Sequence, residues 1–219
     1  MKVFYAAIVG CLSVIFSVYA TSGQTDAFHK GALLVSISEG QTWANYTTEN
    51  TTTNYTDGGY NHGGRDPLFL EYGLSKRWGI GLTSGADLYN VDPSRLYGFG
   101  TPGSPVKAIT SELTVDGHYH FFVTHKTDVS AFAGAGAFSV SMKGNESDYS
   151  YKYQSSGNII RGGVQGRYYF FKRLGFFGSL SAFAAKSSPQ GVKGNTIAND
   201  YNTNISGGAL EFGFCFRFF

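Results

Sequence analysis

The sequence predicts an all-β fold, an eight-stranded antiparallel up-and-down transmembrane β-barrel. After residue 30, large apolar residues recur at every second position and not at helical spacing, which is typical of strands with two different faces. The connections between these segments alternate between long and short, as in a barrel whose two ends face different compartments. We expect strands over residues 30–40, 66–76, 78–89, 107–122, 127–140, 157–171, 174–185 and 205–219.

A leader segment precedes the strands. Lys2 is followed by the apolar run FYAAIVGCLSVIFSVYA and then by the polar residues TSGQTD. This order is typical of an export signal peptide, and the residues VYA predict cleavage after Ala20. The alternatives are a retained membrane anchor, for which the run is short, and a lipoprotein signal ending at Cys11. We therefore divide the chain into a signal peptide, 1–20, and a barrel domain, 21–219.

The expected short turns resemble one another. They lie near residues 76–77, 124–126 and 172–173, and two of them share a pattern, YGLSKRWGIG and YYFFKRLGFFG. Both run from aromatic residues into Lys-Arg and then into an apolar residue and Gly. Aromatic residues gather in this way at membrane interfaces, although a hairpin corner in any β protein would explain the basic pair. The expected long loops are 41–65, 90–106, 141–156 and 186–204.

Each expected strand has an apolar face and a polar face, because side chains alternate across a strand. Within 107–122, Ile109 and Leu113 share the apolar face, and Glu112 and Asp116 share the polar face. A soluble β-sandwich alternates in the same way, with its apolar face turned inward. Charged residues make up only 15% of this chain, whereas about 25% is usual in soluble domains. We therefore expect the apolar faces to meet lipid, among them Leu68, Leu70, Tyr72, Leu74, Ile160, Val164, Tyr168 and Phe170.

Closure into a barrel also explains how the exported chain is held together without a disulfide. Once the leader is removed, the remaining cysteine is Cys215. In a closed barrel every backbone donor of a strand pairs with a neighbouring strand, and no edge is left open.

The polar faces predict a charged interior. Eight strands enclose a space just wide enough for side chains to fill, and an unpaired charge in such a place is costly. We therefore expect paired charges that plug the lumen. The alternative is a wet lumen that conducts small ions, which Gly79, Gly81 and Gly85 would permit. The expected charge network consists of Glu71, Glu112, Asp116, His118, His120, Arg161, Arg167, Glu211 and Arg217.

Histidines raise the question of a metal site or a catalytic site. His118 and His120 lie two positions apart beside Asp116, and a His-x-His pair can supply two metal ligands. No further ligand is visible, so we interpret them as polar lumen residues. His62 lies in the sequence NHGGRD without a serine motif, which we interpret as loop chemistry. We expect no enzyme activity and no catalytic, cofactor-binding or metal-binding residue.

The last expected strand ends in FGFCFRFF, in which aromatic residues alternate with Gly, Cys and Arg. It resembles the C-terminal aromatic signature by which bacterial outer-membrane proteins are recognised by their barrel assembly machinery. With the leader, the eight alternating segments and the basic-aromatic turns, the chain is similar to the small outer-membrane β-barrels of Gram-negative bacteria, such as the transmembrane domain of outer membrane protein A. The resemblance implies an outer-membrane location, contact with lipid and lipopolysaccharide, and an assembly signal at Phe214, Phe216, Phe218 and Phe219.

The long polar loops are the expected working surface. WANYTTENTTTNYTDGGYNHGG and KGNESDYSYKYQ are rich in Tyr and Asn with Gly or Ser, a composition that makes adaptable contact surfaces on a rigid scaffold. We expect a structural or surface-interaction role, with an extracellular ligand or a host surface as partner. Alternatives are loops that only shield the cell, a narrow porin-like channel, a secreted lipocalin-like carrier and a lipid-modifying enzyme. A net charge of +2 gives no sign of a nucleic-acid partner.

Overall fold

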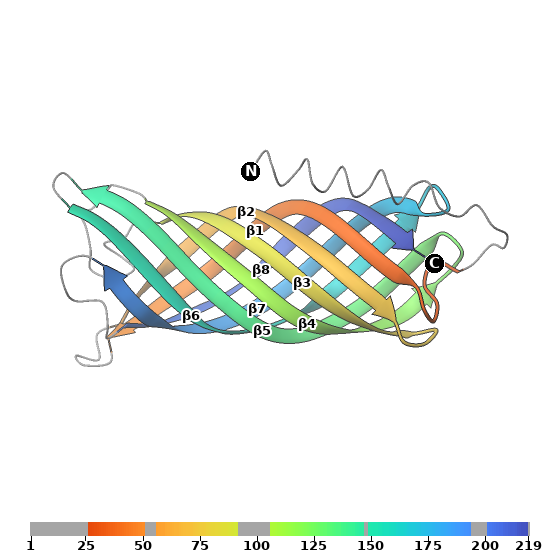
Figure 1. The fold of residues 1–219 in the computed structure, drawn as a ribbon, viewed down its shortest axis with the longest axis horizontal. Helices are drawn as coiled ribbons and strands as arrows, with labels where there is room; N and C mark the ends of the chain where they lie inside the picture. Colours follow the sequence, from red (N-terminus) through yellow and green to blue (C-terminus); the bar gives the residue numbers. More distant parts are fainter. Residues whose placement is uncertain (1–25, 51–55, 92–105, 147–148, 194–200, 219) are drawn as a thin grey trace.

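The computed structural model describes residues 26–50, 56–91, 106–146, 149–193 and 201–218. Within them the strands form a closed antiparallel barrel, in which each strand pairs with its neighbours in sequence and the last pairs with the first (Figure 1). The predicted fold class is therefore confirmed. The strands are β1 (Leu33–Asn50), β2 (Thr56–Gly73), β3 (Trp78–Val91), β4 (Val106–Val123), β5 (Thr127–Glu146), β6 (Tyr149–Tyr169), β7 (Leu174–Lys193) and β8 (Tyr201–Phe218).

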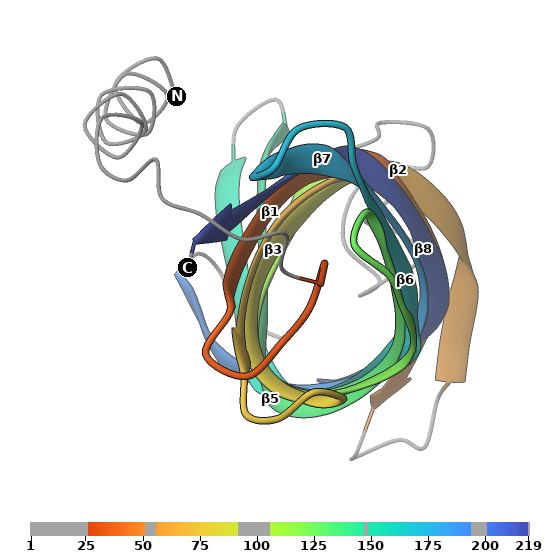
Figure 2. The same ribbon diagram turned by 90° about the vertical axis from the view of Figure 1, so that its right-hand side faces the viewer.

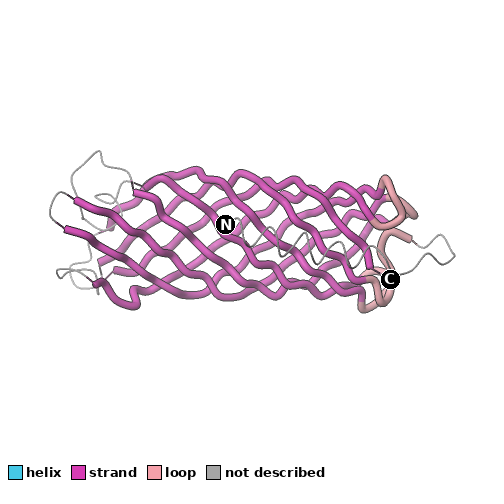
Figure 3. Tube along the Cα trace, turned by 45° about the horizontal axis from the view of Figure 1, so that its top comes forward, coloured by secondary structure: helices cyan, strands magenta, loops and turns pink. Residues whose placement is uncertain are grey.

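The short turns gather at one end of the barrel, where β8 also ends (Figure 3). They connect β2 to β3, β4 to β5 and β6 to β7 over residues 74–77, 124–126 and 170–173, as the sequence predicts. A backbone hydrogen bond from Leu74 N to Trp78 O (2.8 Å) closes the first of them. We call this end of the barrel the turn end, and the opposite end the far end.

The strands continue much further toward the far end than the sequence predicts. β1 and β2 remain paired through most of the predicted loop 41–65, with Trp43 opposite His62. β5 and β6 likewise pair as far as Glu146 opposite Tyr149. The prediction of long loops is wrong for these stretches, because a strand ladder uses backbone groups and does not need apolar alternation. Most of the predicted loop 90–106 lies outside the described residues.

The two faces of the strands carry the residues that the sequence predicts. On β4, Ile109, Leu113 and Val115 are exposed, whereas Glu112 and Asp116 are buried. None of the described residues forms a helix long and apolar enough to cross a membrane. Exposed apolar side chains form a belt around the barrel, which includes Leu68, Leu70, Tyr72, Leu74, Leu82, Ile160, Val164, Tyr168, Phe176, Leu180, Leu210, Phe212 and Phe214.

The belt is interrupted on β1 and β2. Glu39 is exposed on β1 between Ile37 and Trp43, which are also exposed. On β2, Asp66 is exposed next to the outward-facing Leu68. The register pairs Ile37 with Leu68, so the two carboxylates lie on neighbouring strands at about the same height. This part of the outer face is therefore acidic within an otherwise apolar surface.

The segment before β1, residues 26–32, folds into the turn end of the barrel (Figure 2). Gly31 N donates to Gly73 O (2.8 Å), which ties the segment to the end of β2. Gly31 turns the chain with a φ of 84°, a left-handed conformation that glycine adopts without steric cost. Phe28 is thereby buried, with 1% of its surface exposed. We call residues 26–32 the mouth segment.

The interior contains both apolar layers and charged groups. Along β4 from the far end, buried Ala108 is followed by buried polar residues, among them Glu112 and His120. At the far end an apolar layer is built from Ala44, Tyr46, Tyr89, Ala108, Phe138, Val140, Ile159 and Ala185. Toward the turn end, two further apolar groups contain Ala27, Phe69, Tyr169, Phe177 and Cys215, and Phe28, Ala32 and Leu34.

Candidate functional site in the barrel interior

The first charged group centres on Arg65, and we call it the Arg65 cluster. Arg65 Nη1 donates to Asp87 Oδ1 (2.8 Å), Nε donates to Glu211 Oε1 (2.6 Å), and Nη2 donates to Glu112. Arg161 Nη1 donates to the same Glu112 oxygen (2.7 Å). The cluster thus joins five strands, β2, β3, β4, β6 and β8. A guanidinium suits this place because its planar fork of donors can serve several carboxylates at once.

Neighbouring side chains hold the Arg65 cluster in place. Thr110 donates to the second oxygen of Asp87 (2.9 Å). The Arg161 guanidinium lies over the rings of Phe69 (5.5 Å to the centroid) and Phe132 (5.1 Å). Such cation–π contacts are strongest where water is excluded, so the apolar layer toward the turn end also supports the charges.

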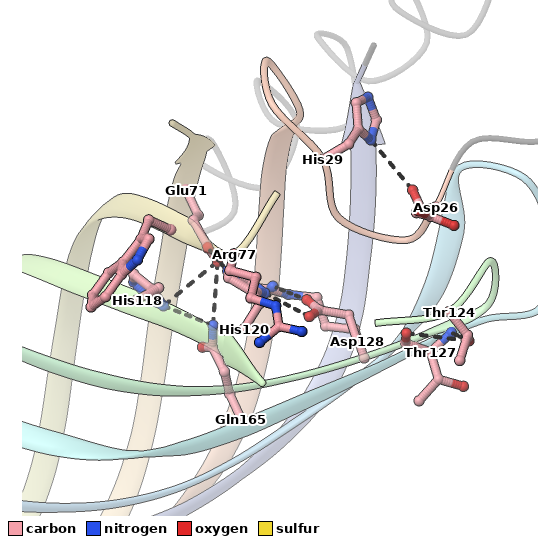
Figure 4. Close-up of polar contacts among 12 residues, drawn as sticks. Asp26, His29, Glu71, Arg77, His118, His120, Thr124, Thr127, Asp128 and Gln165 are labelled. Carbon is pink, nitrogen blue, oxygen red and sulfur yellow. Dashed lines mark hydrogen bonds and ion pairs between the residues drawn. The ribbon is translucent and has the colours of Figure 1, made fainter. Parts of the chain in front are cut away.

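The second charged group lies nearer the turn end, and we call it the Glu71 cluster (Figure 4). Arg167 donates to Asp128 Oδ2 (2.7 Å) through Nη1 and to Glu71 through Nη2. His120 lies between the same two carboxylates, with Nδ1 2.6 Å from Asp128 and Nε2 2.6 Å from Glu71. Beside them Gln165 Nε2 is 3.0 Å from Nδ1 of His118, and it also donates to Glu71 Oε2 (3.3 Å).

The contacts of His120 determine its protonation state. Both ring nitrogens face carboxylate oxygens, which accept hydrogen bonds only, so the imidazolium form satisfies both contacts. The ring of Phe28 stacks on His120 with the centroids 3.4 Å apart and the planes at 7°. The mouth segment therefore covers a charged group, and it excludes water from it.

The structure brings together most of the residues that the sequence predicts for the charge network. The Glu71 cluster contains Glu71, His118, His120 and Arg167. The Arg65 cluster contains Glu112, Arg161 and Glu211. Asp116 has different partners, because its carboxylate accepts from the hydroxyls of Thr83 and Thr114.

Arg217 also departs from the expectation. Its guanidinium donates to the backbone carbonyls of Asp26 and Lys172 (2.6 Å to Lys172 O) and lies over the Tyr169 ring at 4.8 Å. The expected pairing of Asp116 and Arg217 with opposite charges in the lumen is therefore wrong. Arg217 instead fastens the mouth segment to the turn between β6 and β7.

Sequence reasoning missed Arg65, Asp87 and Asp128. Arg65 is the last residue of the predicted long polar loop 41–65, one position before the predicted strand 66–76. Every second residue of β2 faces inward, so Glu71 and Arg65 share the inner face. On β3, Thr83 and Asp87 share the inner face in the same way. Asp87 and Asp128 lie within the predicted strands 78–89 and 127–140, so the alternation already contained them, whereas Arg65 lies just outside its predicted strand.

The described residues contain no group of three or more His, Cys, Asp or Glu side chains that could hold a metal ion. Both nitrogens of His120 and Nδ1 of His118 lie against polar neighbours inside the Glu71 cluster. His62 is exposed on β2, in a strand and not in a loop as predicted. Within the described part of the chain, His118 and His120 are thus members of the Glu71 cluster, and His62 lies apart from it on an exposed position of β2.

The predicted terminal signals lie at the edge of what the structure describes. Phe214 is exposed on the outer face of β8, with its ring 5.5 Å from that of Phe176. Phe216 and Phe218 are half-buried. Phe219 and the predicted signal peptide, residues 1–20, lie outside the described residues. An assembly signal at this terminus stays a prediction.

No protein-family model matches the sequence, and no curated protein matches it. Solved structures match by shape. The outer membrane protein OprG from Pseudomonas aeruginosa is 12% identical with a TM-score of 0.52, over 90% of this chain and 99% of that chain. The outer membrane protein AlkL, studied in DMPC bilayers, is 12% identical with a TM-score of 0.51, over 92% and 95%.

The outer membrane protease OmpT from Escherichia coli is more distant, at 8% identity and a TM-score of 0.44, over 91% of this chain and 100% of that chain. At these identities the likeness concerns the fold. The chain is therefore an eight-stranded antiparallel β-barrel with the fold of outer-membrane barrels such as OprG and AlkL.

Proposed function

We propose that this chain resides in a bacterial outer membrane, closes its lumen to solutes, and has a structural or surface-interaction role at its far end. The apolar belt supports the location, because side chains such as Ile160 (62% exposed) and Phe212 (63% exposed) are unfavourable in water and favourable in lipid. A closed barrel also satisfies its strand hydrogen bonds internally, as the hydrocarbon core requires.

The single observation that carries the closed lumen is the pair of buried ion clusters. The Arg65 cluster joins five strands and the Glu71 cluster joins four, β2, β4, β5 and β6, so both extend across the interior. Removing one partner from such a buried pair is strongly unfavourable, so a passing solute would not displace these side chains. The mouth segment adds a cover at the turn end.

Conductance in a planar lipid bilayer tests the closed lumen. We expect the refolded protein to add no steady current above that of the bare membrane, because the clusters and apolar layers occupy the interior. The same preparation, boiled before addition, controls for leaks caused by detergent. A steady, ohmic current from the folded protein alone would instead support the narrow porin-like channel.

The far end offers the surface for partners. Beyond the belt, Asn45, Thr47 and Tyr60 (62% exposed) are carried outward on paired strands, which hold tyrosine and asparagine in fixed positions. We propose an extracellular ligand or a host surface as the partner of this region. Whole cells that carry and lack the protein, tested for adhesion to the same surface, should differ in binding; equal adhesion would favour a shielding role.

A groove of about 410 Å³ at the far end suits a lipid partner. The register aligns Asn158, Lys186 and Asn204 in one row across β6, β7 and β8, beside a row with Ile160 and Ala184. The Lys186 ammonium and the neighbouring amides suit the phosphorylated headgroup of a lipid. The apolar row beside them suits the start of its acyl chains. We propose lipopolysaccharide as the occupant.

Lipid retention tests this groove. Replacing Lys186 by glutamine should reduce the lipopolysaccharide that copurifies with the barrel, as measured by native mass spectrometry. Replacing Lys107, exposed on β4 away from the groove, should leave it unchanged. Equal retention in the wild type and both variants would contradict the assignment.

Gel mobility tests the location. The outer-membrane fraction, unboiled and boiled in SDS, should contain a band whose mobility changes on boiling, since a closed barrel keeps its hydrogen bonds in detergent until heated. A soluble protein with an unshifted band would instead favour a secreted carrier.

The proposal includes no enzyme activity. Mass analysis of lipid A from cells with and without the gene tests the alternative of a lipid-modifying enzyme. The barrel assembly machinery remains a proposed partner of Phe214, Phe216, Phe218 and Phe219.

A further inference from the structure

A group of buried oxygen atoms in the barrel wall has no hydrogen-bond partner among the described residues. They are Oε2 of Glu211 and the hydroxyl oxygens of Ser36, Ser38 and Ser179. Glu211 is 0% exposed, Ser179 3% and Ser38 4%. Buried polar atoms without partners are costly, so such a group marks a place where a ligand of matching chemistry binds.

The strand register brings these oxygens to one patch. Ser179 on β7 stands directly opposite Glu211 on β8. On β1, Gly40 is opposite Glu211, and Ser38 is opposite Gly213. Directly opposed residues such as Ser179 and Glu211 have Cβ atoms about 4.5–5.5 Å apart, and diagonal neighbours such as Ser38 and Glu211 are about 7–8 Å apart. Gly40 and Gly213 add no side chain between Ser38 and Glu211. We call Ser38, Ser179 and Glu211 the Glu211 site.

The charges around this site are not balanced. The Arg65 cluster contains three carboxylates but two guanidiniums, which leaves one negative charge in excess. Glu112 receives both guanidiniums, and Asp87 receives Arg65 and Thr110. Glu211 receives Arg65 on one oxygen only. The excess charge is therefore least compensated at the free oxygen of Glu211.

The neighbouring charges do not supply the missing cation. In the Glu71 cluster, Arg167 and the His120 imidazolium are already matched by Glu71 and Asp128. Asp116 adds a further carboxylate, held by threonine hydroxyls. With Arg217 included, the buried charged side chains described are six carboxylates against four guanidiniums and the His120 imidazolium. Of the buried oxygens without a partner, Ser130 lies on β5 and Gln165 and Tyr169 lie on β6, whereas those of β7, β8 and β1 surround Glu211.

We propose that the Glu211 site binds a small monovalent cation, Na⁺. Hard cations take oxygen ligands from carboxylates and uncharged groups, and a single excess negative charge matches a monovalent ion. Divalent ions are usually bound by more carboxylate oxygens than the one that is free here. The bound ion neutralises Glu211 and links β7, β8 and β1, which include the strand pair that closes the barrel.

Thermal unfolding of the refolded barrel tests the site. Tm is followed by the heat-dependent change in gel mobility, at constant pH and ionic strength, while NaCl replaces N-methylglucamine chloride. Because the ion binds the folded state, Tm should rise with Na⁺ and the rise should follow a saturable binding curve. Equal Tm values in the two salts would overturn the proposal and indicate bound water or a protonated Glu211.

Matched variants assign the effect to Glu211. Glu211→Gln should lose the Na⁺-dependent rise in Tm, whereas Glu39→Gln, which changes an exposed acid on β1, should retain it. An unchanged rise in Glu211→Gln would refute the site. If that variant does not fold, Ser179→Ala keeps the carboxylate and should require several-fold more Na⁺ for the same rise; an unchanged requirement would also refute it. A crystal grown in Tl⁺ should show an anomalous peak beside Glu211.

Discussion

Arg65 supports more carboxylates than any other side chain in the described interior. Its three nitrogens reach Asp87, Glu112 and Glu211, which come from three different strands. The side chain is 2% exposed, so water does not replace these contacts. Arg65 therefore compensates buried carboxylates on β3, β4 and β8, and it shares only Glu112 with a second guanidinium, that of Arg161.

We predict that Arg65→Met destabilises the barrel by about 3–5 kcal/mol, the cost of leaving the carboxylates of a buried ion pair without their partner. Arg65→Lys should cost less, because it keeps the charge but loses the planar fork of donors. Urea unfolding in lipid vesicles measures both. A wild-type stability for Arg65→Met would mean that the acids are protonated or paired elsewhere.

Among the strands, the β1–β2 hairpin differs from the rest in two ways. Its far half is a paired polar ribbon, and the acidic break of Glu39 and Asp66 lies where the apolar belt continues on the other strands. A carboxylate that faces lipid raises the free energy of the folded barrel. The cost is less than the roughly 2–4 kcal/mol that a lysine or arginine costs at the bilayer centre. The hairpin therefore carries a local cost in the membrane.

Removing these acids should stabilise the barrel in lipid. We predict that Glu39→Leu combined with Asp66→Leu raises the free energy of unfolding in vesicles by about 1–2 kcal/mol, and less in detergent. Glu49→Leu, an exposed acid near the far tip of β1, is the matched control and should change little. If the double variant loses stability, the acidic break makes contacts that compensate its cost.

Elements also show how far sequence reasoning extends. The turns and the inward and outward faces followed from alternation, because it is a local property of each strand. The length of β1, β2, β5 and β6 did not, since residues 41–50, 56–65 and 141–146 show no sustained alternation of large apolar and polar residues, and the alternation in 149–156 rests on tyrosines alone. The far halves become strands because they form hydrogen bonds with a neighbouring strand, and the sequence of one segment alone does not show that partner.

In the whole molecule, buried apolar layers and ion clusters follow one another along the interior. The mouth segment, the Glu71 cluster, the Arg65 cluster and the far-end apolar layer succeed one another along the barrel. The proposed closure of the lumen therefore does not depend on one layer, and the loss of one layer should leave the others intact.

A variant of the mouth segment tests this arrangement. We predict that Phe28→Ala lowers Tm, because it removes a buried ring that stacks on His120. The same variant should still give no steady current in a planar bilayer, because the Arg65 cluster and the far-end layer remain. A current from Phe28→Ala alone would show that the mouth segment is the principal barrier.

The sequence by itself determined the number of strands, the direction of their faces and the place of the short turns, because period-two alternation and turn residues are encoded locally. Only the tertiary structure decided which charges meet. Arg65 and Glu211 are 146 positions apart, and they meet because β8 closes on β1 and the register places both of them opposite Gly40 of β1. The register between strands sets those partners, and alternation within a strand carries no record of it.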